Sequence, residues 1–401
     1  MPASRPRVQS LDGLRGLAAL IVLVHHSLLV VPALAAPYYG GRAEPGATWL
    51  LVHTPLHLLW GGTEAVYLFF ILSGLVLSLA ARSRSFTWRS YYPSRIVRLY
   101  VPVIGAVVLA GIVIALVPRD GATESVWLSR RSDDYPISSM LEDATLLGGP
   151  SGVVSPLWSL YWEVLFSLLL PVYLYAARRM PAWLQAVIAV ALSTIGTLEG
   201  VTALKYLPMF GLGVALAAGW ERLGETVGRM PRAVAIPAWT VAVAGALVLT
   251  SSYWLVLPYT DRVTARAATM PLTLVGVAIL IVAAVHAGLL ARILSSRPFL
   301  FLGTISFSLY LVHEPIVIAI GHLVPRPFMT VLIALPVALL VAVVFYHVVE
   351  RPAHLLAKRV RDHAANEVVP APARGGDRPS APVDADAVPD GVRTTAVVGQ
   401  N

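Results

Sequence analysis

The chain contains no cysteine among its 401 residues, and only 13% of its residues are charged. Without thiols it has no disulfide, no thiolate nucleophile and no cysteine-ligated metal. The P-loop lysine motif, the HExxH zinc motif and the GxSxG nucleophile elbow are also missing. These absences exclude P-loop nucleotidases, HExxH metalloproteases, cysteine hydrolases and serine hydrolases of the elbow type.

Apolar residues are abundant instead. They make up 57% of the chain, and the mean hydropathy is +0.72. This composition is too apolar for a soluble domain and predicts an all-α integral membrane protein. Apolar stretches near the ~20 residues needed to cross a bilayer predict about ten transmembrane helices. The predicted spans are 14–36, 57–80, 96–117, 157–177, 181–199, 202–220, 234–255, 267–287, 299–321 and 328–349.

Connections rich in arginine alternate with connections that hold few basic residues, and this alternation predicts the orientation of the protein in the membrane. The connections after the even-numbered spans hold Arg82, Arg84, Arg89, Arg95, Arg178, Arg179, Arg222, Arg229, Arg232, Arg292 and Arg297. The longest opposite connection, 118–156, is mainly acidic. By the positive-inside rule both termini are cytoplasmic, in the bacterial cytoplasmic membrane. The net charge of +8 is therefore explained without a nucleic-acid partner.

The ends of the chain differ from the rest. We interpret 1–352 as the membrane domain and 353–401 as a short basic segment followed by a disordered cytoplasmic tail. The N-terminal run also resembles a signal peptide with a small-residue cleavage site. Cleavage would leave nine spans and spoil the charge alternation, so we favour a first transmembrane helix.

The most informative polar residues lie in the first span. Arg15 and His26 are eleven positions apart, so both project from one helix face about 16 Å apart along the axis, and Asp12 shares that face. Ionisable groups inside an apolar helix are costly and usually mark a reaction site or a polar pathway. The pattern is typical of a membrane enzyme or of a secondary transporter.

Further polar residues fall in the outer half of other spans by their position in sequence. These are Glu64, Glu163, His313 and Glu314. We expect them to share one cavity with His26, where a carboxylate, Glu163 or Asp12, would orient His26 for general acid and base work. The alternative is that each one only bonds to a neighbouring helix.

Arg95 and Arg98 begin the third span, where guanidinium groups suit the phosphates of a donor substrate. Ordinary positive-inside anchoring is the alternative. Glu350 is predicted at the same face and can pair with one of them. Ser73 with Gly74, and Gly211 with Gly213, indicate close helix packing rather than chemistry. No metal site is expected, because adjacent His25 and His26 diverge on a helix.

Taken in order, several motifs resemble the acyltransferase 3 family of multi-pass membrane O-acyltransferases. They are Leu11 to Arg15 with His26, Phe69 to Gly74, Arg95 and Arg98 with Pro102, Pro156 to Glu163, Ser308 to His313, and Glu350 to Pro352. The family often has Asp just before the Phe-Phe block, whereas this chain has Tyr67 there and Glu64 three residues earlier.

The resemblance implies an enzyme that moves an acyl group, commonly acetyl, from acyl-CoA to a hydroxyl of a carbohydrate. It implies catalytic roles for Arg15, His26 and Glu163, to which we add Asp12, and acyl-CoA binding by Arg95 and Arg98. We expect Glu64, Trp158, Tyr310 and His313 on the acceptor side. The acceptor is either a cell-envelope carbohydrate or a glycosylated small molecule of the macrolide type. A transporter and a scaffold for polysaccharide assembly are the rival functions, and both predict no acyl turnover.

Overall fold

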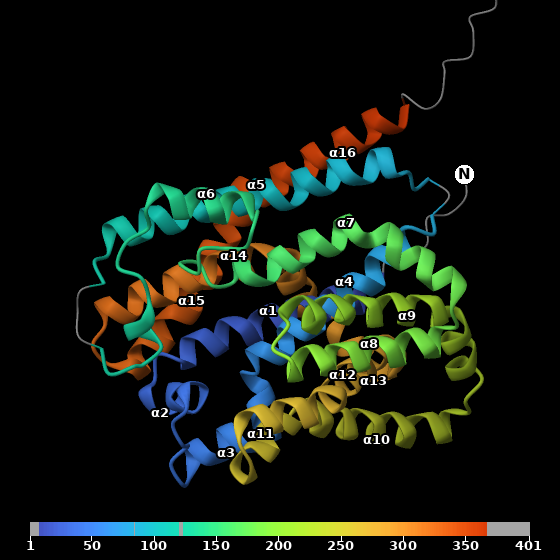
Figure 1. Cartoon of the computed structure of the whole chain (residues 1–401), viewed down its shortest axis with the longest axis horizontal. Helices are drawn as coiled ribbons and strands as arrows, with labels where there is room; N and C mark the ends of the chain where they lie inside the picture. Colours follow the sequence, from blue (N-terminus) through green and yellow to red (C-terminus); the bar gives the residue numbers. More distant parts are fainter. Residues whose placement is uncertain (1–7, 84, 120–122, 367–401) are drawn as a thin grey trace, which may run out of the picture.

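The computed structural model describes residues 8–83, 85–119 and 123–366. Across these residues the fold is a bundle of helices without strands (Figure 1). The long helices are α1 (Gln9–Leu28), α4 (Gly62–Ala80), α5 (Trp88–Leu116), α7 (Leu157–Arg179), α8 (Ala182–Leu198), α9 (Thr202–Gly228), α10 (Arg232–Thr250), α12 (Arg262–His286), α14 (Arg297–Leu323), α15 (Pro327–Phe345) and α16 (Arg351–Asn366). The shorter elements are α2 (Pro32–Ala35), η1 (Ala36–Tyr39), α3 (Ala47–His53), η2 (Pro55–Leu59), η3 (Leu128–Arg130), α6 (Ile137–Thr145), α11 (Ser252–Val256), η4 (Leu257–Tyr259), α13 (Gly288–Leu294) and η5 (Tyr346–Glu350).

In the described part of the chain, nine helical segments are long and apolar enough to cross a membrane, and α8 is a shorter apolar helix. The prediction of an all-α membrane protein with about ten spans is therefore confirmed. Some boundaries differ. The first span, α1, ends at Leu28 rather than residue 36, and the second, α4, begins at Gly62 rather than residue 57. In both places a proline starts a separate short element, because Pro32 opens α2 and Pro55 opens η2.

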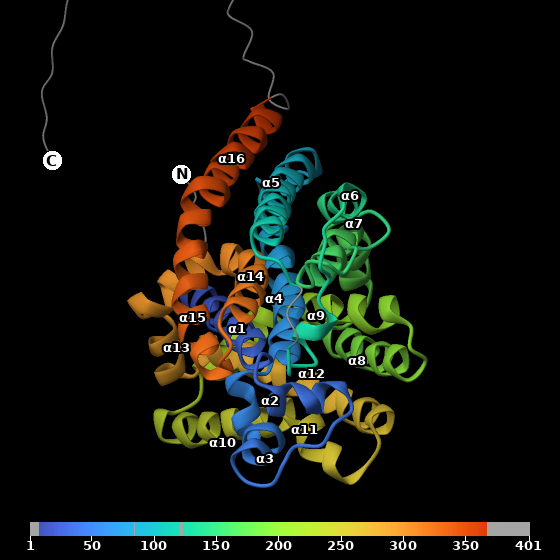
Figure 2. The same ribbon diagram turned by 90° about the vertical axis from the view of Figure 1, so that its left-hand side faces the viewer.

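Helix α1 lies at the centre of the bundle, between α14 and α4 (Figures 1 and 2). Its contact with α14 is close because glycines face each other. A Cβ atom at Gly16 would lie 2.3 Å from the Gly303 nitrogen, and one at Gly303 would lie 2.3 Å from the Asp12 carbonyl oxygen. Such spacing lets two backbones approach as only small residues allow. The polar residues of α1 and α14 are therefore held in fixed register.

A similar contact joins α4 to α9. A Cβ atom at Gly74 would lie 2.1 Å from the Phe210 oxygen, and one at Gly213 would lie 2.0 Å from the Ile71 oxygen. The interpretation of these two glycines as packing residues is confirmed.

The last described part of the chain is almost one continuous helix. Helix α15 passes through the π-turn η5 into α16, which runs beside α5 (Figures 1 and 2). The predicted domain boundary after residue 352 falls inside this helical run. The predicted short basic segment around Lys358 lies in α16, and the predicted disordered tail falls on residues from 367 onward, outside the described residues.

The long connection between α5 and α7 packs against the end of α1. The Ser125 hydroxyl donates to the Leu29 carbonyl at 2.6 Å, and Trp127 is 1% exposed. Asp143 organises the same connection, because it accepts hydrogen bonds from the backbone and hydroxyl of Ser151 and from the Tyr135 hydroxyl. The described part of the connection, from residue 123 onward, therefore covers this end of the bundle.

Candidate functional site

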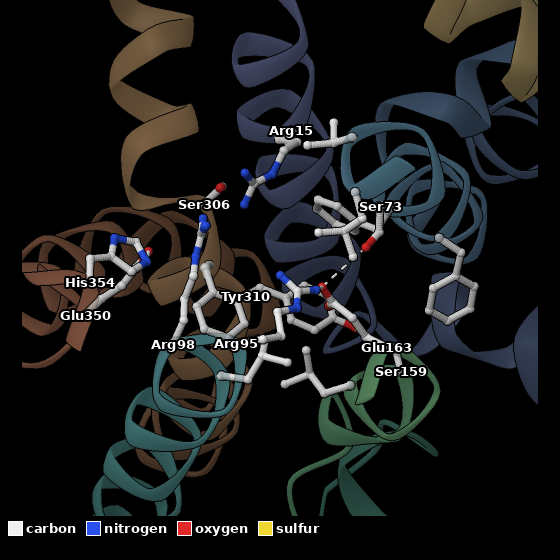
Figure 3. Close-up of a pocket in the computed structure, with 17 residues that line it drawn as sticks. Arg15, Ser73, Arg95, Arg98, Ser159, Glu163, Ser306, Tyr310, Glu350 and His354 are labelled. Carbon is white, nitrogen blue, oxygen red and sulfur yellow. Dashed lines mark hydrogen bonds and ion pairs between the residues drawn. The ribbon is translucent and has the colours of Figure 1, made fainter. Parts of the chain in front are cut away.

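A polar pocket lies between α1, α4, α5, α7 and α14, closed on one side by the start of α16 (Figure 3). We call it the arginine pocket. Its polar lining residues are Arg15, Ser73, Arg95, Arg98, Ser159, Glu163, Ser306, Tyr310, Glu350 and His354. Arg15, Arg95 and Arg98, which are far apart in the sequence, thus meet in one cavity. The lining contains these three arginines and two carboxylates, so its formal charge is positive when His354 is neutral.

An ion pair spans one wall of the pocket. Arg95 Nη2 donates to Glu163 Oε1 at 2.5 Å, and Arg95 Nε donates to Ser167 Oγ at 3.2 Å. The Ser73 hydroxyl donates to the same Glu163 oxygen at 3.4 Å (Figure 3). The sequence predicted Glu163 in the outer half of the membrane and Arg95 at the inner face. This prediction of two different depths is wrong, because the two side chains form an ion pair. Because α5 begins at Trp88, Arg95 lies about two turns inside its helix and reaches the level of Glu163.

Glu350 occupies the opposite wall. Its Oε2 accepts hydrogen bonds from the Ser308 N–H at 3.0 Å and from the Ser308 hydroxyl at 2.5 Å, and Oε1 lies 3.5 Å from His354 Nε2. The π-turn η5 ends at Glu350, and π-turns inside helices occur often at functional sites. Figure 3 shows the side chains of Arg15 and Arg98 between this wall and the Glu163 wall. Arg98 keeps an exposed side chain there, available to a ligand.

His26 pairs with His313 rather than with a carboxylate. His26 Nδ1 lies 2.7 Å from His313 Nε2, and His313 Nδ1 lies 2.9 Å from the Leu309 carbonyl oxygen. A carbonyl only accepts, so the proton of a neutral His313 is on Nδ1 and its Nε2 is an acceptor. His26 therefore donates from Nδ1, which leaves His26 Nε2 with a free lone pair. This tautomer, assigned from the hydrogen bonds, is the one that a general base needs.

The outer connection covers this histidine pair. The Trp127 ring stacks on His26 with ring centroids 5.6 Å apart, and the Arg131 guanidinium lies 4.9 Å from the centre of the Trp127 ring. Arg131 Nη1 in turn donates to Glu314 Oε1 at 3.2 Å. Ser155 also donates to Glu314, through its backbone N–H at 2.7 Å and through its hydroxyl. Both oxygens of Glu314 thus accept hydrogen bonds from the connection between α5 and α7 and hold that connection in place. The expectation that Glu314 lines a cavity with His26 was wrong.

Tyr310 links the two polar regions. It lines the arginine pocket, and its ring lies 6.0 Å from the His313 ring. The Ser159 hydroxyl donates to the Pro156 carbonyl, so the Tyr310 hydroxyl donates to Ser159 Oγ at 2.6 Å. His26 itself is partly exposed, although rings surround it on several sides.

The expectation that two histidines and three glutamates share one cavity was wrong. Glu163 is held by Arg95, and Asp12 lies about 21 Å from His26 along α1, so neither contacts His26. Glu64 accepts from Trp254 Nε1 at 3.2 Å and lines a second cavity. Trp158 packs against Phe70 and Tyr206 instead of lining a polar site.

Some site residues were missed by sequence reasoning. Trp127 and Arg131 lie in a connection without periodicity, and nothing in their spacing points to His26. Ser308 could have been found, because it precedes His313 by five positions in a motif that was singled out. Among the described residues no three potential ligand side chains gather as a metal site.

The membrane bundle thus holds a basic pocket and, on the other side of Tyr310, a partly exposed imidazole whose Nε2 carries a lone pair. The model of an acyltransferase domain matches residues 8–347, and the chain belongs to the acyltransferase 3 family. It is therefore a multi-pass membrane acyltransferase. The chain is similar to acyltransferase MdmB of Streptomyces mycarofaciens, at 28% identity over 338 residues, which cover 80% of this chain and 82% of that protein. No solved structure shows significant similarity to the chain.

Proposed function

We propose that this acyltransferase moves an acyl group, acetyl in the simplest case, from acyl-CoA to a hydroxyl of a carbohydrate or glycosylated acceptor at the bacterial cytoplasmic membrane. The observation that carries the proposal is the bonded pair of His26 and His313 next to the arginine pocket. A partly exposed imidazole of defined tautomer provides the base, and the guanidinium groups provide the phosphate contacts of the donor.

The donor occupies the arginine pocket in this proposal. Arg95 and Arg98 contact the phosphates of CoA inside the bundle, in the half of α5 that the positive-inside rule assigns to the cytoplasmic side. The pantetheine arm then extends past Tyr310 toward His26. Arg15 and His26 lie about 16 Å apart along α1, and we infer that the arm spans that distance.

The acyl transfer uses His26 Nε2. This nitrogen removes the proton of the acceptor hydroxyl while the hydroxyl oxygen bonds to the thioester carbonyl carbon. The carbon–sulfur bond breaks, the acyl oxygen ester remains on the acceptor, and the CoA thiolate takes the proton from the imidazolium of His26. The hydrogen bond to His313 keeps Nδ1 protonated throughout, so that His26 presents Nε2 to the reactants.

The test is acyl transfer by purified protein in proteoliposomes supplied with acetyl-CoA that carries a labelled acetyl group. The candidate acceptors are extracts of surface glycans and of glycosylated small molecules from the producing cell, analysed by mass. The proposal expects a labelled ester product and free CoA, and a rate lower by about 10²–10⁴ in His26→Ala. Normal insertion of that variant is checked by its thermal unfolding.

Two outcomes contradict the proposal. Full acyl transfer by a folded His26→Ala protein would show that His26 is not the general base. An intact thioester with every extract, accompanied by movement of an acceptor across the membrane, would favour a secondary transporter.

A further inference from the structure

A long apolar groove lies between α8 and α10, with α9 and α12 contributing the rest of its lining. We call it the α8–α10 groove. Its volume is about 930 Å³, and it shares no lining residue with the arginine pocket. Thr194 is the one hydroxyl in the lining, and this hydroxyl already donates to the Val190 carbonyl at 2.8 Å. The groove therefore suits a hydrocarbon chain rather than a polar ligand.

The arrangement of the helices creates the groove. Helix α12 packs against both α8 and α10, and these two helices lie on either side of it (Figures 1 and 2). Among the nine candidate spans in the described residues, α10 is the least buried. Ala191 on α8, Ala242 on α10 and Ala278 on α12 line the groove. Because their side chains are short, they leave the space between the helices open.

The groove occupies one half of the membrane. Its lining runs from Leu212 to Leu223 on α9 and from Pro271 to Val282 on α12, and each stretch is about 16 Å long. In the predicted topology both helices begin at the outer side, so these stretches lie in the cytoplasmic half. One leaflet supplies about half of the ~30 Å apolar core. The groove thus has the length of one lipid chain in the cytoplasmic leaflet.

Aromatic and cationic residues lie toward the cytoplasmic end of the groove. Trp239 lines the groove, and its ring stacks on the His286 ring with centroids 6.5 Å apart. The Trp220 ring lies 5.7 Å from the same His286 ring. Tryptophan is enriched at the level of the lipid headgroups. Arg222, which is exposed and directly precedes the lining residue Leu223, places a guanidinium group where it can bind a phosphate.

We propose that the α8–α10 groove is a binding site for one anionic phospholipid of the cytoplasmic leaflet, with one chain in the groove and the headgroup phosphate at Arg222. An apolar hollow does not hold water, and if it were empty its lining would lose dispersion contacts. A chain in the groove contacts four helices, whereas a chain beside a convex surface contacts fewer atoms. The bound lipid should therefore stay on the protein when the surrounding bilayer is removed. This proposal does not depend on the acyl-transfer reaction.

The test is the retention of lipid. The full-length protein is reconstituted in vesicles of equal parts phosphatidylglycerol and phosphatidylcholine, extracted with mild detergent and analysed by native mass spectrometry. We expect one retained lipid, which is mainly phosphatidylglycerol because its net charge is negative. Ala242→Trp fills the groove and should lower retention about tenfold or more. Val241→Trp is the matched control, because the neighbouring Val241 is 72% exposed and does not line the groove, and it should retain lipid normally.

Two further variants complete the test. Ala191→Trp fills the groove from α8, so the prediction can still be tested if Ala242→Trp does not fold, and thermal unfolding identifies the folded variants. Arg222→Gln should keep a bound lipid but lose the preference for phosphatidylglycerol.

Several results would overturn the proposal. Wild-type protein without a retained lipid, or equal retention by a folded groove-filling variant, would show that the groove is not a lipid site. A lipid-free dimer that Ala242→Trp disrupts would show that a second copy of the chain covers the groove instead. An unchanged lipid preference in Arg222→Gln would contradict the binding of the headgroup at Arg222.

Discussion

His26 Nδ1 lies 2.7 Å from His313 Nε2, and the Leu309 carbonyl determines which of the two nitrogens carries the proton. In the proposed mechanism a neutral imidazole thus does the orienting that a carboxylate does in the Ser-His-Asp triad. The pair joins α1 to α14, two helices whose register is set by facing glycines.

We therefore expect His313→Phe to lower the rate of acyl transfer by about 10²-fold or more, because His26 loses the partner that selects its tautomer. KM for acyl-CoA should change little, since His313 lies outside the arginine pocket. Steady-state kinetics with labelled donor measure both quantities. His363→Gln, at an exposed position on α16, is the control. An unchanged kcat in a folded His313→Phe protein would contradict the orienting role.

The exposed side chain of Arg98 in the arginine pocket leads to the opposite kinetic pattern. Arg98→Ala should raise KM for acyl-CoA about tenfold or more, because one charge-assisted hydrogen bond to phosphate is worth about 1.5–3 kcal/mol. The kcat at saturating donor should fall much less. Arg229→Ala removes the same charge from an exposed position in a connection assigned to the same side, and it should have no effect. An unchanged KM for acyl-CoA in Arg98→Ala would show that the donor phosphates bind elsewhere.

The ion pair of Arg131 and Glu314 is a stability determinant. Glu314 has a fully buried side chain, so Arg131→Ala leaves an uncompensated charge and should destabilise the protein by about 3–5 kcal/mol. Thermal unfolding in detergent measures the loss. The double variant Arg131→Met with Glu314→Gln should recover most of it, since the buried charge is removed as well. Equal destabilisation of the single and double variants would show that charge is not the cause.

The glycine contact between α1 and α14 gives a second stability test. Gly303→Ala would place a Cβ atom 2.3 Å from the Asp12 oxygen, so the helices must separate, at a cost of about 3 kcal/mol or more. Gly245→Ala in α10 meets no atom within 4 Å and should be neutral or stabilising by helix propensity. The comparison of the two variants in one thermal unfolding assay separates packing from propensity.

Asp261 caps the start of α12. Hydrogen bonds from Thr264 and from the Val263 N–H hold the pKa of Asp261 below its usual range. The stabilisation is therefore present above the usual pKa of an aspartate and is lost as the pH falls through the lowered value. Amide protection at the start of α12 should weaken over that acidic interval. In Asp261→Asn, which keeps the cap without the ionisation, protection should not follow pH in this way.

The helical spans were predictable because about 20 apolar residues in a row have few structural alternatives. The partners of polar residues were not. Depth along a span depends on where the helix begins, and α5 begins outside the apolar run, so Arg95 and Glu163 were assigned to different levels. The rotation of a helix about its axis decides whether a side chain points into a cavity, and a single sequence does not reveal that rotation. For this reason the packing of Trp158 against neighbouring aromatic rings was not predicted.

His26 and Arg15 were found because an ionisable group in an apolar helix is conspicuous. Trp127 was not, because an aromatic residue in a long connection has many uses. Only the folded chain shows that it stacks on His26.

That stacking also decides which parts of the His26 ring are accessible. Trp127, almost wholly enclosed and backed by Arg131, covers one face of the ring. A residue with a small side chain at position 127 would uncover that face, so the tryptophan limits the directions from which another molecule can approach the imidazole.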